Sequence, residues 1–105
     1  MSGLEQLETR RNEIAALCRK YGVKRLRVFG SAVREDWDTH SSDYDFVADF
    51  GYPPTGVNLF TQQFGLIADL QDLLGRSVDV VDLQATSKAN LINAVESEAV
   101  ELYAA

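Results

Sequence analysis

Two carboxylates, Asp43 and Asp45, stand two residues apart at the start of a run of aromatic and branched residues that continues to Phe50. Such a run favours a β-strand, and because side chains alternate between the two faces of a strand, both carboxylates are expected on one face. Residues two apart along a strand are separated by about 6 to 7 Å. Carboxylates at this spacing can converge on hard divalent cations, which prefer oxygen ligands and bring substrate phosphates with them. The pair predicts a site where two Mg²⁺ ions could hold a triphosphate.

A glycine and a serine, Gly30 and Ser31, follow an earlier apolar run that ends at Phe29. The glycine allows a sharp turn and a close backbone approach, and the serine hydroxyl can bind a phosphate oxygen. We expect one short helical turn after this point, with its first N–H groups facing an anion. Arg34, one turn further on, could contact phosphate, pair with an acid or be an ordinary surface arginine.

Taken separately, both features have ordinary explanations. A Gly-Ser pair after a strand is usually a turn, and Asp-x-Asp in a surface strand is usually solvated. Together they are more informative, because like charges on one strand face repel each other unless a cation or a cationic side chain offsets them.

A third acid, Asp79, lies inside the branched run of residues 77–83, which predicts another strand. If this strand lies beside the one that carries Asp43 and Asp45, Asp79 completes a three-carboxylate site on the same face. The alternative is an edge-strand aspartate that pairs with an arginine.

The remaining pattern supplies the elements that must position these residues. Helical spacing of apolar residues predicts one helix over residues 4–21 and another over 58–74, ended by Gly22 and Gly75. A strand is expected over 24–29 and a final helix through Leu91 and Val95. Cys18 and the phenylalanines of the 58–74 helix are expected in the core, and the tail after the final helix either continues as helix or forms an extended edge.

Two polar stretches are left out of the predicted site. The loop before Asp43 contains Trp37, which could stack on a base or fold against the domain, and a solitary His40. The closing glutamates Glu96, Glu98 and Glu101 are interpreted as a solvated face.

Composition limits the possible classes of protein. The 105 residues, 46% of them hydrophobic, are enough for one compact domain, which we expect to span 1–105. A net charge of −6 disfavours extensive nucleic acid binding and suits a basic protein partner. The single cysteine excludes an internal disulfide, and the sequence has neither an apolar run long enough to span a membrane nor the apolar core of a signal peptide, so we expect a soluble cytoplasmic protein.

The Gly30-Ser31 turn, Arg34, the Ser42 to Phe46 segment, Asp79 and the Glu-x-Val-x-Leu-Tyr ending together resemble the minimal nucleotidyltransferases of the DNA polymerase beta-like superfamily. The resemblance extends over nearly the whole chain. Eleven residues separate Ser31 from Asp43, one more than is usual in the family, and we interpret the extra residue as a tolerated insertion in the loop that contains Trp37.

The resemblance implies an α+β palm fold, a small mixed sheet with helices packed mainly on one face. It implies ATP as donor and Mg²⁺ as cofactor, with two ions. Gly30 and Ser31, with Arg34, would hold the triphosphate; Asp43 and Asp45 would bind both metals; Asp79 would bind the catalytic metal and help to activate the acceptor hydroxyl.

Many minimal members look like antitoxins encoded beside a HEPN-family ribonuclease toxin, to which they transfer AMP on a tyrosine hydroxyl. A homo- or hetero-oligomer is therefore possible. Two other functions stay open: a non-catalytic subunit that neutralises a basic partner by forming a complex, and a small-molecule nucleotidyltransferase, which the short chain disfavours.

Overall fold

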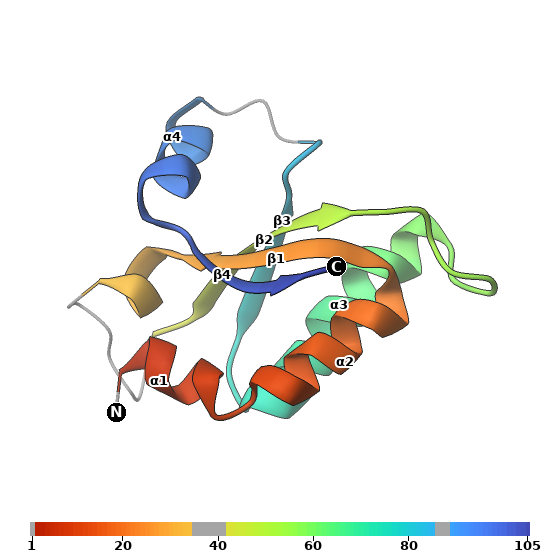
Figure 1. Cartoon of the computed structure of the whole chain (residues 1–105), viewed down its shortest axis with the longest axis horizontal. Coiled ribbons are helices and arrows are strands. Elements are labelled where there is room, and N and C mark those ends of the chain that lie inside the picture. Colours follow the sequence, from red (N-terminus) through yellow and green to blue (C-terminus); the bar gives the residue numbers. More distant parts are fainter. Residues whose placement is uncertain (1, 35–41, 86–88) are drawn as a thin grey trace.

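Four strands form one mixed sheet in the order β3-β2-β1-β4 (Figure 1). The computed structural model describes residues 2–34, 42–85 and 89–105. Strand β1 is antiparallel to both β2 and β4, whereas β2 and β3 are parallel. The elements are α1 (Gly3–Glu8), α2 (Arg11–Tyr21), β1 (Val23–Phe29), the 3-10 turn η1 (Gly30–Val33), β2 (Tyr44–Phe50), α3 (Leu59–Leu74), β3 (Val78–Asp82), α4 (Ala89–Glu98) and β4 (Val100–Ala104).

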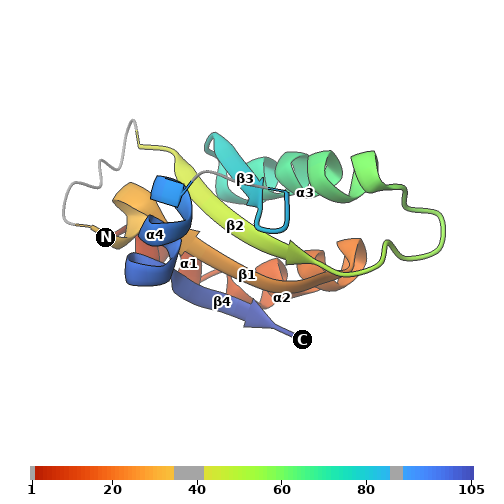
Figure 2. The ribbon, with the colours of Figure 1, turned by 90° about the horizontal axis from the view of Figure 1, so that it is seen from above.

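The alternation of side chains along β1 and β2 divides the core between the two faces of the sheet. Val28 and Phe46 join the main core, which also contains buried residues of α1, α2 and α3. Their neighbours Phe29 and Val47 pack on the other face against Val95 of α4. Helices α2 and α3 therefore cover one face and α4 the other, as the two views of the ribbon show (Figures 1 and 2). This arrangement confirms the expected α+β fold with helices mainly on one face.

The predicted single helix over residues 4–21 is wrong, because the chain breaks at Thr9 and Arg10. The Thr9 hydroxyl donates to the Gln6 carbonyl at 2.7 Å, and the Arg10 N–H bonds to the Leu7 carbonyl at 3.0 Å. The Arg10 bond spans three residues instead of four, so the last turn of α1 tightens and α2 starts in a new direction. A threonine hydroxyl that competes for backbone carbonyls is a known cause of such a break.

Helix α2 itself behaves as expected. It ends at Gly22 in the left-handed conformation, and Cys18 lies fully buried on its inner face. Burial raises the pKa of the Cys18 thiol to about 12, so the thiol stays protonated at neutral pH and carries no chemistry.

The prediction that the phenylalanines of α3 belong to the core is also wrong. Phe60 and Phe64 are 70% and 51% exposed, and their rings lie 4.6 Å apart on the outer side of the helix. A polar residue, Gln62, takes an inner position instead, since its amide donates to the backbone carbonyls of Tyr21 and Gly51 at 2.9 and 3.0 Å. The apolar side chains of α3 lie on more than one side of the helix, but only one side packs against α2 and the sheet.

The closing tail forms the extended edge, which was one of the two alternatives. Strand β4 pairs with β1 and buries Leu102, while its Glu101 carboxylate pairs with Arg25 of β1 at 2.7 Å.

Phe46 is buried and Phe60 is exposed, so the same substitution should lower the free energy of unfolding by different amounts at the two positions. Phe46→Ala, in the fully buried core, should lower the free energy of unfolding by roughly 3 to 5 kcal/mol. Phe60→Ala should lower it by less than about 1 kcal/mol, because the ring is mostly solvated. Urea titration of both variants measures the difference, and equal losses would contradict the placement of Phe60.

Candidate active site

A tight glycine turn ends β1 and starts the site. Gly30 has φ +76°, and a Cβ built on it would lie 2.7 Å from Oδ2 of Asp45, closer than real Cβ atoms approach any atom. The Arg34 N–H then donates to the Ser31 carbonyl at 3.2 Å and closes the 3-10 turn. The predicted turn after Gly30 is confirmed, and both its backbone conformation and its contact with Asp45 require glycine.

The register of the sheet brings two predicted acids side by side. Asp45 pairs with Phe29 across the antiparallel ladder and with Asp79 across the parallel one, so both carboxylates leave the same face of the sheet next to the Gly30 turn. Asp43 lies two residues upstream, just before β2 begins. Asp45 is half-buried, whereas Asp43 and Asp79 are exposed.

The electrostatics of Asp45 reflect this crowding. Burial raises the pKa of the Asp45 carboxyl, the negative charges of Asp79 and Asp43 raise it further, and only the Arg34 guanidinium opposes them. Burial and two neighbouring acids destabilise the ionised form of this carboxyl group. A cation that approaches it therefore stabilises the carboxylate.

The donor atoms suit a hard divalent cation, because every one of the three acids offers carboxylate oxygens. Within residues 2–34, 42–85 and 89–105, however, no three Asp, Glu, His or Cys side chains lie close enough together to hold an ion. The carboxylate oxygens of Asp43, Asp45 and Asp79 are therefore of the type that Mg²⁺ prefers, and an ion bound by all three would require their side chains to converge.

Another acid, which the sequence analysis missed, contacts the turn directly. One carboxylate oxygen of Glu98, Oε1, accepts hydrogen bonds from the Gly30 N–H at 3.2 Å and from Nη1 of Arg34 at 3.3 Å. The interpretation of Glu98 as part of a solvated face is wrong, since its side chain is only 26% exposed. Its spacing from Leu91 and Val95 at i, i+4 and i+7 was the available signal, because this spacing marks the inner side of a helix.

The Glu98 contact also bears on Arg34. Of the alternatives for this arginine, the structure contains pairing with an acid, and the pair links α4 to the turn after β1. The expectations on Trp37, His40 and the longer loop lie outside the described residues.

A glycine turn that faces strand-borne acids on an α+β sheet is an arrangement suited to binding phosphates together with a divalent cation. A family model described as "Polymerase beta, Nucleotidyltransferase" matches residues 12–105, and the chain belongs to this nucleotidyltransferase family.

Several known proteins are similar to the chain. A Methanocaldococcus jannaschii protein named as a protein adenylyltransferase is 31% identical over 71 residues, which cover 68% of this chain and 71% of that protein. The structure of a minimal nucleotidyltransferase aligns with a TM-score of 0.73 and 34% identity over 95% of both chains. A toxin-antitoxin crystal structure with AMP-PNP aligns at 22% identity with a TM-score of 0.69, over 90% of this chain and 73% of that one, which supports the fold.

The close approach of Gly30 to Asp45 predicts that Gly30→Ala costs more stability than backbone strain alone would cause. Gly75→Ala places an alanine at φ +66° with open space around its Cβ, so it should cost about 1 to 2 kcal/mol of stability. Gly30→Ala carries the same strain and also pushes against Asp45, so it should cost more. Denaturant unfolding of both variants measures the difference, and a Gly30→Ala cost no greater than that of Gly75→Ala would contradict the contact.

The raised pKa of Asp45 predicts a pH dependence of stability in the metal-free protein. As the pH rises, the unfolded chain loses this proton first, so the folded state loses stability across the interval between the usual carboxyl pKa and the raised one. Asp45→Asn should therefore be more stable than the wild type at neutral pH, with no such advantage below the usual carboxyl range.

The matched control for this prediction is Asp72→Asn, which removes an exposed carboxylate from α3. It should leave the pH profile of the unfolding free energy close to that of the wild type. An Asp45→Asn profile parallel to the wild-type profile at every pH would contradict the prediction.

Proposed function

We propose that this chain transfers AMP from ATP to a hydroxyl group of a partner protein, and that it acts in this way as the antitoxin of a HEPN ribonuclease toxin. The observation that carries the proposal is the register that sets Asp45 beside Asp79 at the Gly30 turn. The names of similar proteins support it, since one is a protein adenylyltransferase and another, from Shewanella oneidensis, is an MNT antitoxin in complex with a tri-AMPylated HEPN toxin.

The Shewanella oneidensis structure aligns with a TM-score of 0.64 at 20% identity, over 94% of this chain and 73% of that one. This likeness by itself concerns the fold. The assignment of a HEPN partner to this chain therefore rests on the family, on the acidic charge and on the site together.

The proposed reaction is a displacement at the α-phosphorus. The acceptor oxygen forms a bond to that phosphorus, the bond to the bridging oxygen breaks, and pyrophosphate leaves with the electron pair. Asp79 is exposed and lies beside Asp45. In the proposed reaction it would accept the hydroxyl proton, and the Gly30-Ser31 turn and Arg34 would hold the phosphates. When bound, Mg²⁺ supplies Lewis-acid activation of the hydroxyl and neutralises phosphate charge. We propose two such ions, held by Asp43, Asp45 and Asp79.

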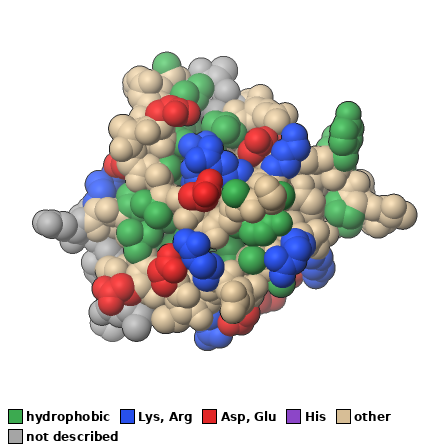
Figure 3. All heavy atoms as spheres, in the orientation of Figure 1, with side chains coloured by type: hydrophobic (Ala, Val, Ile, Leu, Met, Phe, Trp, Pro, Cys, Tyr) green, Lys and Arg blue, Asp and Glu red, His purple; other side chains and the backbone are tan. Residues whose placement is uncertain are grey.

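The face of the protein in Figure 3 favours a protein acceptor over a nucleic acid. Acidic and basic side chains are interspersed over the face in Figure 3, where the described residues form no continuous basic patch. A nucleic acid backbone is bound most strongly by continuous positive charge.

We also place the protein in the cytoplasm, where ATP and a ribonuclease toxin would both be present. Among the described residues, no helix has the length and apolar character needed to cross a bilayer.

The proposal predicts the loss of transfer when the two acids are neutralised. Asp43→Asn combined with Asp45→Asn should reduce the transfer of label from α-labelled ATP to the partner by at least about a thousandfold, because carboxylates that bind catalytic metals supply several kcal/mol. Asp72→Asn combined with Glu96→Gln removes the same charge from two exposed positions on α3 and α4 and should leave transfer within about threefold.

Circular dichroism confirms that the variants are folded. Undiminished transfer by the Asp43, Asp45 double variant would contradict the enzymatic mechanism. Neutralisation of the toxin without any transfer, by the wild type, would instead favour the non-catalytic binding subunit.

A further inference from the structure

The Gly30 turn already holds an anion, and this anion belongs to the protein. The Glu98 carboxylate oxygen lies 3.2 Å from the Gly30 nitrogen and 3.3 Å from Nη1 of Arg34. These are the backbone N–H and the guanidinium that a phosphate group would use at this turn. Since one N–H group donates well to a single acceptor, Glu98 and a phosphate oxygen compete for the same position.

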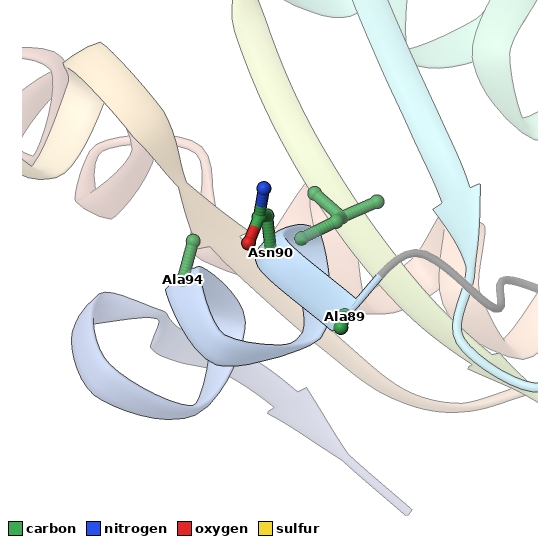
Figure 4. A pocket seen from close by; sticks show the side chains of 4 residues that line it. Ala89, Asn90 and Ala94 are labelled. Atoms are coloured by element: carbon green, nitrogen blue, oxygen red, sulfur yellow. The ribbon is translucent and has the colours of Figure 1, made fainter.

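A hollow lies further along the same helix. Its volume is about 640 Å³, and its lining in the described part of the chain consists of Ala89, Asn90, Leu91 and Ala94. Figure 4 shows the Asn90 and Ala94 side chains projecting from the same side of α4. The hollow is open towards solvent, and its volume lies within the range of about 300 to 1,000 Å³ that pockets for small ligands usually have.

The spacing of three residues connects the hollow to the turn. Asn90, Ala94 and Glu98 follow one another at intervals of four, which places them on one face of α4. Eight residues of helix rise about 12 Å, so Asn90 in the lining of the hollow and Glu98 are separated by about this distance along α4.

We propose that this face of α4 is a wall of the donor-nucleotide site. The Glu98 carboxylate occupies a phosphate position until a nucleoside triphosphate displaces it, and the hollow beside Asn90 and Ala94 receives the nucleoside. The Asn90 amide offers both a donor and an acceptor to the edge of a base, and Leu91 and Ala94 supply apolar surface. This inference rests on the proposed function, since it assigns the donor's binding mode at the same site.

Neutralising Glu98 provides the most direct test. In Glu98→Gln the side chain keeps its size, but it loses the charge-assisted bonds that compete with phosphate, and it no longer repels the triphosphate. The dissociation constant of a non-hydrolysable ATP analogue, measured by calorimetry with Mg²⁺, should fall by about tenfold.

Glu96→Gln is the matched control, because it removes an exposed carboxylate two residues away on the same helix. It should change the dissociation constant by less than about twofold. An unchanged or weaker affinity in Glu98→Gln, with the fold intact by circular dichroism, would overturn the displacement of Glu98 by phosphate.

A second pair of variants tests the hollow and does not depend on Glu98. Ala94→Phe fills the hollow and should weaken the ATP analogue by at least about tenfold while leaving the affinity for inorganic triphosphate within about twofold. Asn93→Phe adds the same ring at an exposed position of α4 and should leave both affinities within about twofold. Equal affinity of Ala94→Phe and the wild type for the ATP analogue would overturn the nucleoside assignment.

These outcomes separate the inference from the proposed function. If the wild type transfers label and the Asp43, Asp45 double variant does not, yet Glu98→Gln and Ala94→Phe bind the analogue as the wild type does, the inference fails alone. If both variants shift affinity as expected but no partner receives label, the inference stands and the protein-modifying function fails.

Discussion

The chain can pass beside Asp45 at the end of β1 only because residue 30 has no side chain. A Cβ on Gly30 would lie 2.7 Å from the Asp45 carboxylate oxygen, and the turn has a positive φ that side-chain-bearing residues rarely adopt. This contact fixes the distance between the turn that we propose as the phosphate site and the strand that carries Asp45. Everything else in the site depends on it, since Ser31 and Arg34 follow the turn directly and Asp79 is placed by its pairing with Asp45.

The electrostatics around Asp45 are unfavourable in the protein without a ligand. Asp45 is half-buried beside two other acids, and burial and the neighbouring charges both raise the pKa of its carboxyl. The opposing charge in the protein comes from Arg34, which Glu98 holds at the turn. A divalent cation with nucleotide phosphates would replace this arrangement with a more favourable one, because it supplies positive charge to the acids and anions to the turn.

Alternation and branched residues predicted the strands that carry Asp45 and Asp79 and the faces of their side chains. That these two strands are neighbours was one of two alternatives, and the parallel pairing of Asp45 with Asp79 decides between them. Sequence patterns failed where long-range contacts decide the outcome. Nothing local in the sequence shows which side of α3 meets the sheet, so Phe60 was assigned to the core. The charge of its neighbours suggests a solvated Glu98, although its spacing from Leu91 and Val95 puts it on the inner side of the helix. The break at Thr9 depends on a single hydroxyl bond that competes with the helix.

We propose that the protein uses Asp43, Asp45, Asp79 and the Gly30 turn to transfer a nucleotide to another protein. The most direct test of this proposal is the intact mass of the protein encoded beside this chain, measured after incubation with this chain, ATP and Mg²⁺. The account predicts that the partner gains the mass of one or more AMP groups and that its ribonuclease activity falls in parallel. A partner of unchanged mass whose ribonuclease activity is nevertheless neutralised would contradict it.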